Sequence, residues 1–245
     1  MKFKKITSVL FILFLSSNVY AQQIVNLILV GNDGVTEDIK KAHSFIIIKN
    51  YSGNIFERLD YKLQAPLVML RTYSDSNLTF QQGKYMEYYP SGELRTSGEY
   101  SNNMKSGDWM HYNDTGKVVL TERYENGNMT EAENPDTVKK KEPLLYGDEK
   151  EANMDGGVKA WINYIKKTLN PDVGQQSVKG GKVRVIFKIN TKGKTSDIYL
   201  KKSVEFVLDE ESLRVIRESP LWEPAFQNGN KVNAYRIQPL TFIKE

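Results

Sequence analysis

The first half of the chain alternates aromatic and apolar runs with short clusters of turn-forming residues. The segment GKYMEYYPSG occupies residues 83–92, and GDWMHYNDTG repeats its plan at residues 107–116. In each, a strand-prone aromatic run leads into a turn containing Pro, Asn, Asp or Gly, and a second mixed run returns. This pattern predicts successive β-hairpins.

The hairpin pattern recurs at a regular spacing. A small residue is followed eight positions later by a tyrosine in four places: Gly53–Tyr61, Ala65–Tyr73, Gly92–Tyr100 and Gly116–Tyr124. Self-similarity at a fixed period indicates a repeat array. One hairpin is marginal alone, so we expect stacked neighbours to bury the aromatic side chains. Two apolar runs within residues 22–52, QQIVNLILVG and HSFIIIKNY, are expected to begin the same sheet.

Four aromatic residues mark the two clearest repeats: Tyr85, Tyr88, Trp109 and Tyr112. We expect them to pack in the core, because large aromatic side chains contribute most of the buried apolar area in such sheets. The alternative is an exposed aromatic row on the repeat surface that binds a ligand or a peptide.

Residues 133–153 break the repeat pattern. They contain Pro135 and Pro143, the lysine run at 139–141 and several acidic residues towards the end. Proline, charge and the loss of periodicity together indicate a solvated linker.

Beyond the linker the apolar positions follow the period of a helix. They fall on one helix face: Val158, Trp161, Ile162, Ile165 and Leu169. Asp155 is placed to cap the start of this helix, and Pro171 prevents its continuation. The sequence therefore predicts one amphipathic helix at the start of a second domain.

Two strands and a second helix follow. Residues 183–189 alternate with one strongly apolar face, residues 190–193 form a hairpin turn, and residues 197–200 return. Asp209 is then expected to cap a helix, with Glu210 and Glu211 in its first turn, where acidic side chains suit the helix dipole.

A last strand is predicted over residues 232–243, and it contains Pro239. The fold class is thus mainly β plus α+β: an N-terminal β-hairpin repeat sheet followed by an α-β-β-α-β domain with about three antiparallel strands. The expected boundaries are 22–132 for the repeats, 133–153 for the linker and 154–245 for the C-terminal domain.

Residues 1–21 have the pattern of a secretory signal peptide. Lys2, Lys4 and Lys5 precede a short apolar run, and small residues precede a cleavage site after Ala21. The alternative is an uncleaved inner-membrane anchor, although the run is about half of the roughly 20 apolar residues that a spanning helix needs. We expect the protein in the periplasm or cell envelope.

Composition narrows the classes of function. The leader carries three of the 34 basic residues, which leaves 31 against 30 acidic residues, a net charge of +1. A nucleic-acid partner needs a basic face, so we expect none. The chain has no cysteine, and its two histidines, His43 and His111, lie in different segments. No catalytic motif is present, so we expect no enzyme activity, no cofactor and no metal site.

Two family resemblances follow from these segments. GKYMEYYPSGELRTSGEY and GDWMHYNDTGKVVLTERYENG resemble MORN-type repeats, in the variant of YwqK-like antitoxin-repeat proteins. GGVKAWINYIKKTLNP, GKVRVIFKINTKGKTSDIYL, SVEFVLDEESLRVI, ESPLWEPAFQNGNKV and YRIQPLTF resemble the C-terminal domain of TonB, the energy transducer of outer-membrane transport. The second resemblance covers residues 155–242, and Asn170 stands where that family usually has an aromatic residue.

The TonB resemblance implies a partner and a mode of binding. Members bind a short extended segment of an outer-membrane TonB-dependent receptor by adding it to an open sheet edge. Carried over to this chain, the edge is the last strand, with Tyr235, Arg236, Ile237 and Gln238 as partner-binding residues. Inner-membrane motor proteins are further partners if the leader is uncleaved, and a homodimer is left open. The alternative function is a secreted repeat-based binding or scaffold protein with no energy-transducing role.

Overall fold

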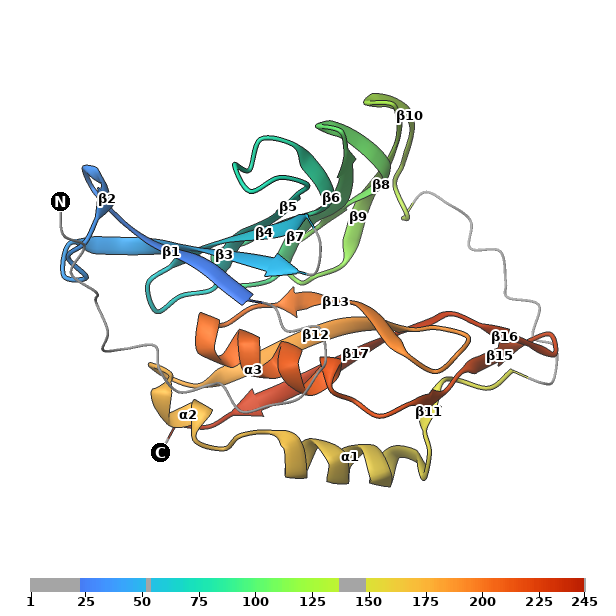
Figure 1. The fold of residues 1–245 in the computed structure, drawn as a ribbon. Coiled ribbons are helices and arrows are strands. Elements are labelled where there is room, and N and C mark those ends of the chain that lie inside the picture. The colour runs from blue at the N-terminus through green and yellow to red at the C-terminus, as the bar shows by residue number, and fades with distance from the viewer. Residues whose placement is uncertain (1–22, 52–53, 137–148, 245) are drawn as a thin grey trace.

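The computed structural model describes residues 23–51, 54–136 and 149–244. The expected signal peptide at residues 1–21 and most of the expected linker lie outside these ranges. The described chain forms two units, an N-terminal sheet and a smaller C-terminal unit that lies against one face of it (Figure 1).

The N-terminal unit is a single antiparallel sheet of ten strands, here called the repeat sheet. Its order is β10-β9-β8-β7-β6-β5-β4-β3-β1-β2, so successive hairpins lie side by side as the repeat pattern predicts. The strands are β1 (Gln23–Gly31), β2 (Gly34–Thr36), β3 (Ala42–Tyr51), β4 (Ile55–Lys62), β5 (Leu67–Tyr73), β6 (Gln81–Tyr88), β7 (Leu94–Ser101), β8 (Met104–Tyr112), β9 (Val118–Glu125) and β10 (Asn128–Glu133).

The register places a glycine opposite a tyrosine in each of the two clearest repeats. Gly83 lies opposite Tyr100 in the β6–β7 hairpin, and Gly107 lies opposite Tyr124 in the β8–β9 hairpin. Both glycines have positive φ, 92° and 66°, a conformation that residues with a Cβ rarely adopt. The two repeats therefore place the same glycine–tyrosine pair at the same point of successive hairpins.

The C-terminal unit contains a three-stranded antiparallel sheet of order β13-β12-β17. The predicted order of helix, strand, strand, helix and strand is confirmed, and five short elements are added to it. The elements are β11 (Asn153–Met154), α1 (Gly157–Thr168), α2 (Val173–Gln176), β12 (Gly181–Ile189), β13 (Thr195–Lys202), α3 (Phe206–Arg217), β14 (Trp222–Glu223), β15 (Ala225–Gln227), β16 (Asn230–Val232) and β17 (Ala234–Phe242).

Three local predictions are corrected by these bounds. The last strand begins at Ala234 rather than at residue 232, because residues 230–232 pair with β15 in a separate hairpin. Gly156, with φ 83°, precedes α1, and Asp155 does not cap it. Asp209 does not cap α3, because that helix begins at Phe206 and Asp209 lies one turn inside it, fully buried.

One continuous hydrophobic core joins the two units. On the repeat sheet, Ile47, Leu59 and Tyr61 face the C-terminal unit, and the rings of Tyr61 and Phe206 meet edge to face at 5.5 Å. Within the C-terminal unit, one face of β12 packs against the helices with every other side chain buried: Val183, Val185, Phe187 and Ile189. Helix α3 packs on its own sheet and also contacts the repeat sheet, through Phe206, Asp209 and Glu210.

The residues just before α1 also pair with the C-terminal unit. Lys150 exchanges two main-chain hydrogen bonds with Phe226, at 3.1 and 2.8 Å, and β11 pairs with β14. Residues 149–153, which the sequence places in the linker, are therefore held against β14 and β15.

Candidate functional site

Strand β17 forms one edge of the three-stranded sheet. In the described part of the chain it pairs with β12 alone, from Ala234 opposite Ile189 to Phe242 opposite Gly181. The ladder has no register shift, so the opposite side of β17 presents a straight row of main-chain groups. We call this row the free edge.

Pro239 fixes which main-chain groups the free edge presents. It lies opposite Arg184 in the ladder, and it has no N–H to donate to β12. Its main-chain groups are therefore those that point outward, away from β12, as expected for proline in an edge strand. Because main-chain groups alternate in direction along an antiparallel strand, Tyr235, Ile237 and Thr241 also direct their N–H and C=O groups outward.

The repeat sheet covers the end of the opposite edge of this sheet, around Lys202 and Ser203. Glu93 and Lys202 form an isolated antiparallel β-bridge, and the N–H of Ser203 donates to the carbonyl oxygen of Gly92 at 2.9 Å. Gly92 allows this approach, because a Cβ there would lie 2.0 Å from the carbonyl oxygen of Ser203. The N–H of Leu67 donates to Oγ of Ser203 at 2.7 Å.

Charged groups surround this covered end of the edge. The carboxylate of Glu93, one-tenth exposed, contacts the guanidinium of Arg184 and lies 3.2 Å from Nζ of Lys202. Nζ of Lys201 lies 3.5 Å from the centre of the Tyr112 ring. Burial and the nearby charge of Arg184 lower the pKa of Lys201 to about 8. These contacts bind β13 to the repeat sheet, so the two edges of the small sheet are not equivalent.

A groove runs beside the free edge, between α1 and β17. It encloses about 210 Å³ and is mainly apolar, with Trp161, Phe187 and Trp222 at its base. Val158 and Ile162 of α1 are 61% and 45% exposed at its border, although both belong to the apolar face of the helix. An extended segment beside β17 would cover these two side chains.

The four predicted partner-binding residues lie on both faces of β17. Tyr235 and Ile237 point away from the helices and are 59% and 52% exposed. Arg236 and Gln238 point towards α1 and line the groove. Arg236 donates to the carbonyl oxygen of Ala152, and its guanidinium carbon lies 5.6 Å from the centre of the Trp222 ring.

The structure divides the four aromatic residues of the repeats. Tyr88 and Tyr112 are buried on the face that meets the C-terminal unit, where the hydroxyl of Tyr88 donates to the carbonyl oxygen of Leu200 at 3.0 Å. Tyr85 and Trp109 lie on the opposite face, with ring centres 5.2 Å apart. They line a cavity of about 420 Å³ together with Tyr100, Lys105 and His111. The four residues therefore do not form one exposed row.

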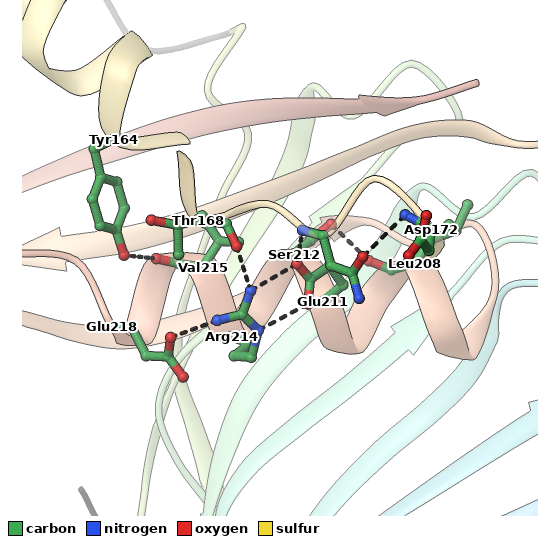
Figure 2. Close-up of polar contacts among 10 residues, drawn as sticks. Tyr164, Thr168, Asp172, Leu208, Glu211, Ser212, Arg214, Val215 and Glu218 are labelled. Atoms are coloured by element: carbon green, nitrogen blue, oxygen red, sulfur yellow. Dashed lines mark hydrogen bonds and ion pairs between the residues drawn. The ribbon is translucent and has the colours of Figure 1, made fainter. Parts of the chain in front are cut away.

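Polar contacts join α1, which borders the groove, to α3 (Figure 2). Arg214 donates to both carboxylate oxygens of Glu211, to Glu218 and to the carbonyl oxygen of Thr168. The hydroxyl of Tyr164 donates to the carbonyl oxygen of Val215 at 2.9 Å. The bond to Glu211 is the main cause that raises the pKa of Arg214.

This network was not predicted from the sequence. Its one sequence signal is the spacing of Glu211, Arg214 and Glu218, which are three and four residues apart and therefore lie on one helix face. The contact with α1 could not be read from that spacing, because the spacing alone is typical of a solvated helix surface.

Metal and membrane signals are absent from the described ranges. In residues 23–51, 54–136 and 149–244, no three His, Cys, Asp or Glu side chains gather as a metal site would require. No helix within these ranges is long and apolar enough to cross a membrane. His111 and Glu122 form a pair, with Nε2 and Oε2 3.1 Å apart.

The comparison with known families identifies the segment that contains the free edge. Residues 171–243 match the family model described as Gram-negative bacterial TonB protein C-terminal. The match confirms the TonB resemblance over α2, β12, β13, α3 and β17, and α1 lies outside it. No curated protein and no solved structure matches the chain.

At the level of the family, the match supports a TonB-like protein in energy-coupled outer-membrane transport. The TonB C-terminal domain is a non-enzymatic, transport-coupling domain, and the family is associated with the cell envelope. Its members generally interact with outer-membrane TonB-dependent receptors.

Proposed function

We propose that this protein binds an extended segment of an outer-membrane TonB-dependent transporter, which adds to β17 as a fourth strand. The observation that carries the proposal is the free edge, because it lies within the segment that matches the TonB C-terminal family. Main-chain hydrogen bonds supply affinity in strand addition, and neighbouring side chains supply specificity.

The outward groups are sufficient for a weak and reversible complex. Tyr235, Ile237 and Thr241 offer an N–H and a C=O each, and Pro239 offers a C=O. Each main-chain hydrogen bond contributes about 0.5–1.5 kcal/mol net. Five or six such bonds together with contacts in the groove reach the roughly 8 kcal/mol of a micromolar complex.

The four residues of β17 have separate roles in this proposal. Tyr235 and Ile237 would contact side chains of the added strand on the open face of the sheet. Arg236 would favour an acidic side chain in the transporter segment. Gln238 and the exposed α1 side chains Val158 and Ile162 would contact the segment on the groove side.

We infer that residues 1–21 are a cleaved signal peptide and that the protein acts in the periplasm or cell envelope. An uncleaved leader would instead anchor it to the inner membrane, within reach of motor proteins. We also infer that residues 22–132 are MORN-type, YwqK-like repeats, which is supported by the shared register of successive hairpins.

A pair of substitutions at one position tests strand addition. Ile237→Pro removes both the exposed side chain and the outward N–H, and its conformation suits a strand that already holds Pro239 two residues on. Ile237→Ala removes the side chain and keeps the N–H. We expect the proline variant to weaken binding at least tenfold more than the alanine variant.

Binding would be measured by calorimetry with synthetic peptides that copy the N-terminal segments of TonB-dependent transporters. Thermal unfolding of both variants serves as the control for folding. Equal affinities in the two variants, or no binding of any peptide to the wild-type chain, would overturn the proposal.

A second candidate function rests on the outer face of the repeat sheet. The cavity of about 420 Å³ there combines aromatic rings with charged side chains, including Glu87, Arg95 and Lys105. This combination supports the alternative of a repeat-based binding or scaffold protein. In the same peptide assay, this candidate predicts that Tyr85→Ala weakens binding and that Ile237→Pro leaves it unchanged, which is the reverse of what strand addition predicts.

A further inference from the structure

The side-chain amide of Gln238 is bonded at both ends beside the free edge. Its Oε1 accepts a hydrogen bond from Nε1 of Trp161 at 2.7 Å. Its Nε2 donates to the carbonyl oxygen of Pro239, also at 2.7 Å. The amide thus links helix α1 to the outer border of β17.

The two partners allow one orientation of this amide. The indole nitrogen of Trp161 can only donate, and the carbonyl oxygen of Pro239 can only accept. Oε1 must therefore face Trp161, and Nε2 must face Pro239. Trp161 is 8% exposed, with its ring centre 4.8 Å from that of Trp222, so the point of attachment on α1 is fixed.

The acceptor that Gln238 occupies belongs to the free edge. Pro239 contributes its C=O to the outward row and has no N–H beside it. In the unbound protein one of the two acceptor sites of this carbonyl oxygen already has a donor. An arriving strand must therefore share the oxygen with the amide of Gln238 or displace that amide.

We propose that Gln238 is a gate residue, whose amide caps the free-edge carbonyl of Pro239 until the main-chain N–H of a captured segment replaces it. The inference rests on the proposed function of strand addition at β17. It adds a requirement on the segment: the residue that faces Pro239 must carry a main-chain N–H, so proline is excluded there. Once displaced, Nε2 remains held near the segment through the bond from Trp161 to Oε1.

Because the amide of Gln238 has to be displaced first, the wild-type protein should bind the segment more weakly than a protein whose free edge is uncapped. Gln238→Met keeps the length of the side chain and removes both hydrogen bonds. Since one net hydrogen bond no longer has to be exchanged, we expect the transporter peptides to bind about two- to tenfold more tightly to this variant. Trp161→Phe, which replaces the indole by a smaller aromatic ring and removes the N–H that holds Gln238, is expected to tighten binding less.

Gln238→Met could also bind more tightly because methionine adds apolar contacts with the peptide. A second measurement distinguishes this cause from loss of the cap on Pro239. Peptides methylated on one main-chain nitrogen at a time would be compared on both proteins. At the position that faces Pro239, methylation should abolish the advantage of Gln238→Met, because the peptide no longer has an N–H to offer. At positions whose N–H points away from β17, the advantage should remain.

The outcomes distinguish the gate from the proposed function. Binding that Ile237→Pro weakens but Gln238→Met leaves unchanged or weaker overturns the gate and leaves strand addition standing. An advantage of Gln238→Met that survives methylation at every position also overturns the gate. Failure of the wild-type chain and of Gln238→Met to bind any peptide overturns strand addition, and the gate with it.

Discussion

Asp209 is fully buried where α3 meets the repeat sheet. Its Oδ1 accepts the N–H of Val204 at 3.0 Å, and its Oδ2 accepts the hydroxyl groups of Ser203 and, at 3.0 Å, of Tyr61. Burial raises the pKa of this carboxyl to about 7, although the three donors act in the opposite direction. A single carboxyl group therefore couples the contact between the two units to pH.

This shift predicts how stability changes with pH. Between about pH 4 and pH 7 the folded state holds a proton that the unfolded state has released, so the free energy of unfolding falls as pH rises, by at most about 1.4 kcal/mol per pH unit. Asp209→Asn cannot ionise and lacks this slope. We expect the difference in stability between wild type and variant to shrink from pH 4 to pH 7 in urea titrations.

Tyr61→Phe provides the control for this prediction. It removes one donor that lowers the pKa of Asp209, so the pH range over which stability falls should extend to higher pH. Parallel stability curves for wild type and Asp209→Asn would show that Asp209 does not titrate in this range.

Single residues also show what local sequence rules miss. An acidic residue near the start of a helix suggests a cap, yet neither Asp155 nor Asp209 caps its helix. Gly156 turns the chain into α1, and Asp209 bonds back to Ser203 and Val204 from inside α3. The partner that buries Asp209 comes from residue 61, and no local pattern can indicate so distant a contact.

Among the elements, β7 and β8 are in close contact where Gly98 of β7 faces the ring of Trp109 of β8. A Cβ at Gly98 would lie 2.3 Å from the ring of Trp109, which is 2% exposed. Trp109 is also in ring contact with Tyr85, Tyr100 and Tyr124. Glycine at this point lets the indole ring lie flat on the sheet.

Gly98→Ala should destabilise the repeat sheet by about 1–3 kcal/mol, because the added methyl group forces Trp109 out of its position. Gly98 does not have positive φ, so the cost is steric rather than conformational. Urea unfolding followed by near-ultraviolet circular dichroism would measure it.

A double substitution tests the cause of that loss. In the background of Trp109→Leu, the smaller side chain leaves room for the methyl group, and Gly98→Ala should cost less than in the wild type. Strictly additive effects would assign the destabilisation to some other contact.

Elements with a strong period were predictable, and short ones were not. The two-residue alternation and the turn residues predicted the hairpins of β6–β7 and β8–β9, and the helical period predicted α1. The strands β11, β14, β15 and β16 have two or three residues each, which is too few to show a period. Their pairing depends on partners far along the chain, such as Lys150 with Phe226.

Across the whole molecule, the two units share one core and a set of buried polar contacts. Besides the contacts of Asp209 and Glu93, Nζ of Lys49 lies 2.6 Å from Oε1 of Glu210, and this lysine is 2% exposed. Units joined in this way should unfold in one transition.

The three tryptophans allow this to be measured. Trp109→Phe leaves reporters in the C-terminal unit alone, and Trp161→Phe with Trp222→Phe leaves one in the repeat sheet. Glu93→Ala should lower the stability seen by both reporters by the same amount, about 1–2 kcal/mol, because its partners Arg184 and Lys202 are about one-third exposed. A shared core would be contradicted if the two reporters showed transitions at different urea concentrations and Glu93→Ala shifted only one of them.

The contact between the two units could not be predicted from the sequence. Tyr88 and Tyr112 were expected to be buried, and the repeat pattern attributed this to stacking of neighbouring hairpins. Their burial depends instead on the C-terminal unit, through contacts such as Tyr88 with Leu200. Periodicity indicates which face of a strand is covered, but it carries no information about which distant segment covers it.

The Gly92–Glu93 turn has a consequence for stoichiometry. Since it covers the end of β13 next to Ser203, strand addition as proposed has one edge that is open along its whole length, at β17. We therefore expect one transporter segment per chain, a stoichiometry that terminates a ladder and neither bridges two transporters nor propagates into a polymer.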